Sequence, residues 1–368
     1  MKTTIKRIIC VVLFVALIAR SLAVGSIAVI PKVNLKEAGM KDATAFGIIS
    51  EPKNTIDAVF VGDSEVYRSI MPLRIWEDYG ITSYVCSTPA QRLYYSLEFL
   101  EKAFETQCPK YVFIETNSFF RDFTVSDRIE NKAEKLVPFF RYHTNIREIF
   151  ADGFNLKKIF SSPDYSSTIN DKGYRLSLKV RGRKPKNNYM AYSKEREQIS
   201  DANIKYIKRI KAFCEKNGAS LIFLSIPSCQ NYNYKRHNSI SDLANLLCVS
   251  YIDMNLLNKE VPINWKKDTY DKGDHLNYHG AEKVSVYLGK YLFETNTLQD
   301  KRNDRDYESW NDSVDNFYIE LEEAKAKRAE RKKEKKNKKN LLSKLLREKT
   351  VTVTEPETDF SETESLKS

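Results

Sequence analysis

The stretch Ile56-Asp57-Ala58-Val59-Phe60-Val61-Gly62-Asp63-Ser64 decides the fold class of this chain of 368 residues. A short apolar run that ends at a glycine is typical of a strand buried on both faces of a sheet. Four similar runs follow at residues 82–86, 111–114, 221–224 and 249–252. Helical patterns separate them at residues 64–70, 93–104, 204–214 and 281–293. This alternation predicts an α/β fold in which helices cover both faces of a parallel sheet.

The residues that follow the first strand are the first part of a candidate active site. Gly62-Asp63-Ser64 opens a predicted helix, so the hydroxyl and N–H of Ser64 would lie at a helix N-terminus, where negative charge is stabilised. A nucleophilic serine needs a base, and the base needs a carboxylate that orients it. The segment Asp271-Lys272-Gly273-Asp274-His275-Leu276-Asn277 offers His275 as the base and either Asp271 or Asp274 as the carboxylate. The alternative is that Ser64 only caps its helix and that His275 lies in a surface loop.

These two motifs resemble those of the SGNH (GDSL-like) hydrolases over about residues 55–297. Gly62-Asp63-Ser64 matches the first motif block of that family, and Asp274-His275-Leu276-Asn277 matches the last. More narrowly, the chain resembles the exported branch related to the alginate O-acetylation proteins and the teichoic-acid D-alanyl transfer protein. The resemblance implies a three-layer α/β/α sandwich around a five-stranded parallel sheet. It also implies a serine acyl-esterase or O-acyltransferase that uses no metal or organic cofactor.

The resemblance further implies an oxyanion hole, formed by the N–H of Ser64, an N–H of the second block and the amide of Asn117. The family has a glycine in the second block, whereas this chain has Ser87 or Thr88 there. The family also places an aspartate three residues before the histidine, where this chain has a lysine, so both Asp271 and Asp274 remain candidates, with Asp271 slightly favoured. These departures support an alternative function, a non-catalytic glycan-binding or assembly protein with a degenerate site.

Candidate substrate-binding residues come from an insertion at about residues 120–200, which is rich in Arg, Tyr, Phe and Asn. An insertion after the third strand would lie over the carboxyl edge of the sheet, where open α/β folds bind ligands. Arg141 and His143 of this insertion, and Gln91 of the second block, are therefore expected to contact the substrate. The alternative is a structural elaboration, in which His143, like His237 and His279, has a structural role or is exposed.

The N-terminal residues 1–31 form a targeting segment. Basic residues precede an apolar run from Ile8 to Ala19 that resumes from Leu22 to Ile30. This pattern predicts either a signal peptide, cleaved after Ser21-Leu22-Ala23, or an uncleaved membrane anchor. In both cases the body is exported, either held at the cell membrane or secreted. Residues 32–54 are expected to be a linker. The expected partners are an acylated glycopolymer and, by the resemblance, a membrane-bound O-acyltransferase.

The formal net charge of +11 belongs almost entirely to the C-terminal tail. Residues 325–349 hold thirteen basic and three acidic side chains, a net charge of +10, so the rest of the chain carries +1. The tail, residues 299–368, is expected to be disordered or helical. A nucleic-acid partner is not expected, because the body lacks a nucleic-acid-binding motif. The six cysteines show no CxxC spacing, so a zinc site is not expected either.

Overall fold

The computed structural model describes residues 2–147, 155–165, 170–183 and 188–351. The chain divides into two compact units, residues 1–317 and 318–368. The end of the predicted tail, residues 352–368, lies outside the described residues, as do parts of the predicted insertion. The candidate site and the sheet both belong to the first unit.

The first unit is built on a sheet of five parallel strands, as predicted. The strands are β1 (Ala58–Gly62), β2 (Ser83–Ser87), β3 (Tyr111–Glu115), β4 (Ser220–Ser225) and β5 (Ser250–Asp253). Their order in the sheet is β2-β1-β3-β4-β5. The chain therefore adds β2 on one side of β1 and then returns to add β3 on the other. In open α/β sheets the crevice at such a reversal is where ligands bind, and β1 and β3 carry Ser64 and Asn117 just beyond their carboxyl ends.

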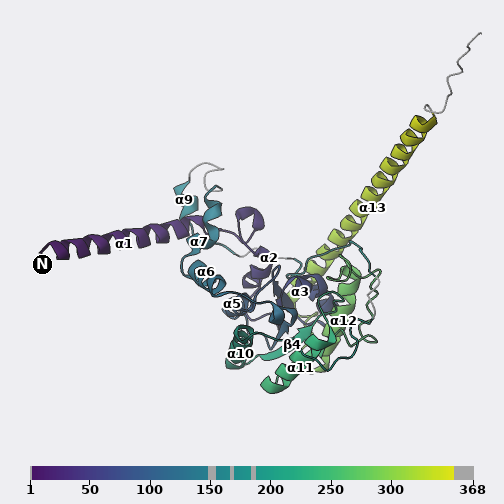
Figure 1. Ribbon diagram of the computed structural model, residues 1–368, viewed down its shortest axis with the longest axis horizontal. Coiled ribbons are helices and arrows are strands. Elements are labelled where there is room, and N and C mark those ends of the chain that lie inside the picture. Colours follow the sequence, from purple (N-terminus) through teal and green to yellow (C-terminus); the bar gives the residue numbers. More distant parts are fainter. Residues whose placement is uncertain (1, 148–154, 166–169, 184–187, 352–368) are drawn as a thin grey trace, which may run out of the picture. The chain divides into compact units, whose positions relative to one another are not determined.

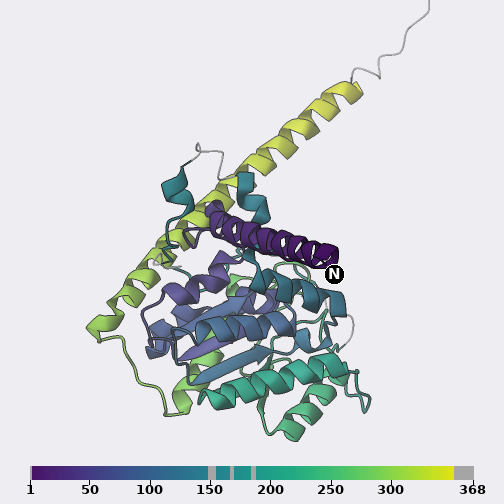
Figure 2. The ribbon, with the colours of Figure 1, turned by 90° about the vertical axis from the view of Figure 1, so that its left-hand side faces the viewer.

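Two helical layers cover the sheet, which completes the predicted three-layer α/β/α sandwich (Figures 1 and 2). One layer contains α3 (Ser64–Ser69), α4 (Pro72–Tyr79) and α12 (Tyr278–Glu294), and the other contains α2 (Ala43–Phe46), α5 (Leu93–Ala103) and α10 (Asp201–Lys216). Helix α11 (Tyr234–Leu247) packs against β5. Phe60 belongs to the core under the first layer. Since successive strand residues point to opposite faces, Val59 and Val61 fill the core under the second.

The remaining elements lie at the two ends of the chain and in the insertion. They are α1 (Lys2–Val29), η1 (Lys36–Ala38), η2 (Gly47–Ser50), η3 (Asn117–Phe120), α6 (Val125–Leu136), α7 (Pro138–Tyr142), η4 (His143–Asn145), α9 (Leu156–Ile159), η5 (Arg305–Tyr307) and α13 (Glu308–Val351). Helix α1 is the predicted N-terminal apolar helix. Among the described residues it is the one helix long and apolar enough to cross a membrane.

Residues 32–54 are part of the folded unit rather than the predicted linker. Ala45 and Ile48 are completely buried, and α2 packs against β2 and α5. Glu51 forms a buried ion pair with Lys172, whose Nζ lies 2.9 Å from Oε1 of Glu51 and 4.7 Å from the ring centre of Trp310. The prediction failed because the helices of this segment have three or four residues each, too few to show a periodic pattern.

The body extends further toward the C-terminus than the predicted boundary at residue 298. Trp310 is buried, with its ring centre 5.4 Å from that of Trp76, and Phe317 is buried as well. Residues 318–351 of the second unit belong to helix α13. The few apolar residues after residue 298 pack against a core that earlier elements form, so the sequence around them has no core pattern of its own.

Candidate active site

Strand β1 and helix α3 position Ser64. The side chain of Asp63, 1% exposed, caps α3 by accepting the N–H of Glu65 at 2.9 Å. A Cβ atom at Gly62 would lie 2.4 Å from Cβ of Glu115 and 2.5 Å from Cγ2 of Val66. The sharp turn that presents Ser64 therefore requires glycine at position 62.

His275 reaches Ser64 from the loop between β5 and α12. Its Nε2 atom lies 2.7 Å from Oγ of Ser64, and its Nδ1 atom lies 2.6 Å from Oδ2 of Asp271. The backbone N–H of His275 donates to the other carboxylate oxygen of Asp271 at 2.8 Å. The structure thus brings Ser64, His275 and Asp271 into one hydrogen-bonded row. Asp274, the other candidate, lies 3.5 Å from Nδ1, too far for a good hydrogen bond.

The shape of this loop explains why the carboxylate four residues before the histidine lies behind its ring. Lys272 and Gly273 both adopt left-handed backbone conformations, with φ of +75° and +93°. The N–H of Gly273 donates to the hydroxyl of Thr269 at 2.9 Å, which closes the turn. Asn277 then caps α12 by accepting the N–H of His279 at 3.1 Å. The turn folds Asp271 back onto His275, while Asp274 points to one side.

The hydrogen bond between His275 and Asp271 shifts the pKa values of both side chains. Burial lowers the pKa of His275, but the hydrogen bond with Asp271 and the negative charges of Asp274, Asp271 and Glu65 outweigh it, so the pKa lies above its usual value. Burial raises the pKa of Asp271, but its hydrogen bonds with the side chain and backbone of His275 outweigh that effect and leave the pKa lowered. Asp271 is therefore the ionised partner of an imidazole that binds protons more strongly than usual.

Asn117 lies at the same edge of the sheet as Ser64, in η3. Its side chain is 7% exposed, and its Oδ1 atom accepts a hydrogen bond from Nη1 of Arg236 at 2.7 Å. This bond fixes the amide so that Nδ2 is left as the donor. Nδ2 lies 3.4 Å from Oδ2 of Asp63, which also binds Arg121 at 2.5 Å. The amide has a second N–H with which to meet a developing negative charge.

The second motif block lies directly beside the first. Ser87 pairs with Gly62 in the register of β1 and β2, and it is 2% exposed. In the described part of the chain its hydroxyl has no hydrogen-bond partner. Neither Ser87 nor Thr88 has a positive φ, and the left-handed residue of this loop is Ala90, with φ of +53°. The backbone of residues 87 and 88 does not need a glycine, so its absence leaves the loop conformation intact.

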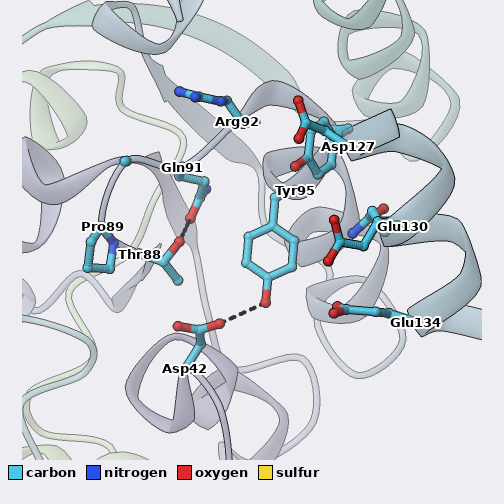
Figure 3. Close-up of a pocket in the computed structure, with 12 residues that line it drawn as sticks. Asp42, Thr88, Pro89, Gln91, Arg92, Tyr95, Asp127, Glu130 and Glu134 are labelled. Carbon is cyan, nitrogen blue, oxygen red and sulfur yellow. Dashed lines mark hydrogen bonds between the residues drawn. The ribbon is translucent and has the colours of Figure 1, made fainter. Parts of the chain in front are cut away.

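Gln91, a predicted substrate ligand, is hydrogen-bonded within the protein. It is 2% exposed, accepts the hydroxyl of Thr88 at 3.0 Å, and donates to the hydroxyl of Ser96 at 3.0 Å. It therefore holds the loop after β2 together. The loop forms one wall of a cavity of about 380 Å³ between α5 and α6, in which Tyr95 donates to Asp42 at 2.7 Å (Figure 3).

Arg141 and His143 also differ from their predicted roles. Arg141 is 6% exposed, is bound to Glu98 at 3.1 Å, and lies against the rings of Phe46, Tyr95 and Tyr142. His143 is exposed and contacts the carbonyl oxygen of Phe140 at 2.9 Å. This half of the insertion packs against α1, and Asn131 and Arg141 both bind Glu98 of α5. The later segment, residues 170–183, lies along the site loop instead, where the N–H of Arg181 donates to the carbonyl of Thr269 at 3.0 Å.

A buried polar network under the site was not predicted. Glu65 is 3% and Glu115 is 1% exposed, and burial, followed by the charge of Asp63, raises the pKa of both well above its usual value. Asn231 donates to Glu65 at 2.9 Å and also to Asp274, which joins the network to the loop of His275. Glu65 and Glu115 stand next to the motifs and could have been noticed, whereas nothing in the sequence marks Asn231.

An aromatic and cationic rim beside His275 was also missed. The ring of Tyr270 meets the imidazole edge to face at 6.1 Å. The guanidinium of Arg68 and the ammonium of Lys179 lie 5.1 Å and 4.8 Å from the centre of that ring. Tyr270 directly precedes Asp271, and that adjacency is a signal that sequence reasoning can use.

The same loop contains a group of side chains close enough together to hold a metal ion. Among the described residues, Asp271, Asp274 and His275 offer ligand atoms within 4.8 Å of one another. The Nδ1 atom of His275 already contacts Asp271, so an ion bound to Nδ1 would compete with that hydrogen bond.

Comparison with known proteins gives likenesses among solved structures only. No family model matches the chain, and no curated protein matches it. The similar structures include a Bacteroides fragilis protein assigned as an acylhydrolase, with 13% identity and a TM-score of 0.34, covering 70% of this chain and 99% of that one. A GDSL-like lipase from Bacteroides thetaiotaomicron has 12% identity and a TM-score of 0.30, with coverage of 65% and 88%. An acetylxylan esterase from Geobacillus stearothermophilus has 9% identity and a TM-score of 0.31, with coverage of 65% and 94%.

Proposed function

We propose that this protein is an SGNH-type serine acyl-esterase or O-acyltransferase. The observation that carries the proposal is the row in which Nε2 of His275 lies 2.7 Å from Oγ of Ser64 and Nδ1 lies 2.6 Å from Asp271. A serine hydroxyl, a histidine and a half-buried carboxylate in this geometry form the arrangement that activates a nucleophile. A serine that only caps its helix does not account for the row, because Asp63 already provides the cap of α3.

The proposed reaction runs in two halves. Oγ of Ser64 attacks the acyl carbonyl while Nε2 of His275 takes the hydroxyl proton, and Asp271 holds the imidazolium. The N–H of Ser64, an N–H of the loop at Ser87, and Nδ2 of Asn117 are the donors for the oxyanion. His275 then gives its proton to the leaving oxygen, and the acyl group stays on Ser64. In the second half, water or a sugar hydroxyl loses a proton to His275 and attacks the acyl carbonyl. The bond between the acyl carbon and Oγ then breaks, and His275 returns the proton to Oγ of Ser64.

We further propose that the body is exported and works on an acylated glycopolymer of the cell envelope or the extracellular space. The exposed apolar surface of α1 supports an uncleaved anchor. The substrate class rests on the resemblance of the motifs to the exported branch of the SGNH hydrolases. A transferase needs an acyl donor, and a membrane-bound O-acyltransferase is the partner that we propose for that case.

The test compares the full chain, purified in detergent, with its Ser64→Ala variant on p-nitrophenyl acetate and on an acetylated polysaccharide. We expect Ser64→Ala to lower kcat by about 10³-fold or more, because the row then lacks its nucleophile. Equal thermal unfolding midpoints would show that the variant is folded. Wild-type turnover no faster than that of Ser64→Ala on both substrates would overturn the proposal. Polysaccharide binding of equal affinity in both proteins would then support the non-catalytic alternative.

A further inference from the structure

Helix α6 turns its apolar side chains away from the body. Val125, Ile129 and Leu136 are 61%, 63% and 73% exposed. At 3.6 residues per turn they lie within about 40° of one another around the helix axis. No described residue of α6 is buried. We call Val125, Ile129 and Leu136 the outer face of α6.

The opposite side of α6 is acidic and faces the protein. Asp127, Glu130 and Glu134 line the cavity that the loop after β2 and Tyr95 also enclose (Figure 3). Asn131 donates to Glu98 of α5 at 3.0 Å. A helix on the surface of a water-soluble domain has the reverse arrangement, with the apolar side chains inward. The outer face of α6 is therefore a surface that some apolar environment covers.

The apolar surface continues from α6 to the end of α1. Phe140, Ile146, Leu156 and Phe160, from α7 to the end of α9, are 45%, 40%, 57% and 51% exposed. The same helices pack around the last turns of α1, as Figures 1 and 2 show. The N–H of Phe139 donates to Oγ of Ser26 at 3.0 Å, and the amide of Asn145 donates to the carbonyl of Val29 at 3.1 Å. The C-terminal end of α1 is thus held by α7 and η4.

Basic side chains border the outer face of α6. Arg128 and Lys132 follow the apolar stripe on one side, whereas all three acidic residues of α6 lie on the inward side. Such a helix, apolar on one face and flanked by basic residues, fits the interface of a bilayer, with its apolar side chains about 5–10 Å into the headgroup region. Basic flanks add attraction to anionic headgroups.

We infer that α6, α7 and α9 form a membrane-contact surface that holds the catalytic unit directly against the bilayer. The segment Thr3–Val29 is long enough to cross a membrane, and these helices pack where it ends. They therefore lie at the depth of the headgroups when α1 spans the bilayer. The inference goes beyond the proposed activity and rests on the proposed anchoring by α1. The anchor would then join the body through packed helices rather than through a free tether.

The test uses the full chain in vesicles of phosphatidylcholine and phosphatidylglycerol with bromine on the acyl chains, close to the headgroups in one set and near the middle of the bilayer, where Phe14 would lie, in a second set. Ile129→Trp and Leu136→Trp report on the outer face of α6, and Phe14→Trp reports on α1. Leu246→Trp is the matched control, since Leu246 is 72% exposed on α11, which packs against β5, the strand at the other end of the sheet from β2. The wild-type emission, which comes from the buried Trp76 and Trp310 and the half-buried Trp265, is subtracted.

We expect brominated lipid to cause a loss of the added emission of Ile129→Trp and Leu136→Trp but not of Leu246→Trp. The loss should weaken when phosphatidylglycerol is left out, because the basic flank then has no anionic headgroup to bind. Emission from both α6 variants that matches the Leu246→Trp control would overturn the inference. If Phe14→Trp alone loses emission, the anchor stands and a protein partner must cover the outer face of α6. If Phe14→Trp is also unaffected, both the membrane-contact surface and the anchoring by α1 are wrong. Esterase turnover is measured separately, so this result does not decide the proposed activity.

Discussion

The Nε2 atom of His275 lies 2.7 Å from Oγ of Ser64, although 211 residues separate the two along the chain. Ser64 follows β1, and His275 belongs to the loop between β5 and α12. Because all five strands are parallel, the loops that follow them open at one edge of the sheet. The distance thus results from the topology, and the loop residues around His275 decide which carboxylate assists it.

The two aspartates near His275 should differ strongly in their effect on catalysis. We expect Asp271→Asn to lower kcat by about 10³- to 10⁴-fold, because an amide at 2.6 Å from Nδ1 favours the wrong tautomer of the imidazole. Asp274→Asn should lower it by about tenfold or less, which corresponds to about 1.4 kcal/mol, since Asp274 lies 3.5 Å away. Steady-state kinetics on p-nitrophenyl acetate measure both. The reverse order of the two effects would assign the orienting role to Asp274.

The pH dependence of kcat/KM should show an acid limb above pH 6.5. His275 must be neutral to take the proton of Ser64, and its raised pKa keeps it protonated to a higher pH than usual. Activity therefore falls as the pH drops through that raised value. Asp274→Asn removes one of the negative charges that raise the pKa, so its acid limb should shift to lower pH. A wild-type limb below pH 6.5 would contradict the electrostatic account of the site.

Arg236 should act on catalysis through Asn117. Asn117→Ala removes one oxyanion donor, so we expect kcat to fall by about 10²- to 10³-fold with little change in KM. Arg236→Met frees the amide of Asn117, whose Oδ1 atom Arg236 holds at 2.7 Å, and should also lower kcat. In the double variant the two losses should not add, because Arg236 has no oxyanion donor left to position. Additive losses would show that Arg236 acts independently of Asn117.

Glu65→Gln should change stability in a pH-dependent way. The pKa of Glu65 is raised in the folded state by burial and by the charges of Asp63 and Glu115. The folded protein therefore holds this proton more tightly than the unfolded chain does. As the pH rises above 4.5, the ordinary pKa of a glutamate, the carboxyl of Glu65 lowers the stability of the wild-type protein. Chemical denaturation near pH 4 should give similar stabilities for Glu65→Gln and wild type, with the variant gaining relative stability toward pH 8. A gain that is independent of pH would rule out this linkage.

Removing one partner of the ion pair between Glu51 and Lys172 should destabilise the protein strongly, because the other charge is then buried without a partner. Both side chains are almost fully buried, so we expect Glu51→Leu or Lys172→Met alone to cost about 3–5 kcal/mol in the free energy of unfolding. Glu51→Leu combined with Lys172→Met should cost less than the two single changes together, since no unpaired charge remains. The control is Asp242→Asn, which breaks the exposed pair with Arg196 and should change the free energy of unfolding far less than either change at the buried pair. Fully additive losses at Glu51 and Lys172 would contradict this account.

The sheet could be predicted from the sequence because each strand is buried on both faces. Such strands are short apolar runs, and the runs at residues 56–61 and 111–114 differ from β1 and β3 by two residues or fewer. The positions of Ser64 and Asn117 then follow from the parallel arrangement. The sequence favours Asp271 over Asp274 only slightly, because the position of Asp271 behind the imidazole depends on the left-handed turn at Lys272 and Gly273.

The parts that could not be predicted depend on packing between distant segments. Arg141 has the composition of a ligand-binding residue, but its partner Glu98 lies on a helix 43 positions earlier, and this contact has no local signature. Asn231 and Arg236 also contact residues far away along the chain, Glu65 and Asn117, and these contacts have no local signature either. Residues 32–54 were missed because their short helices acquire order only by packing against β2 and α5.

Because 211 residues separate Ser64 from His275, the two can meet only late in the synthesis of the chain. A ribosome that has made all five strands has not yet made His275, since β5 ends at Asp253. Until the loop at residues 268–277 and helix α12 follow, Ser64 has no base and remains an ordinary hydroxyl. Under the proposed function, the protein is therefore inactive through most of its synthesis, and a chain that ends early within this loop carries a serine that has no base.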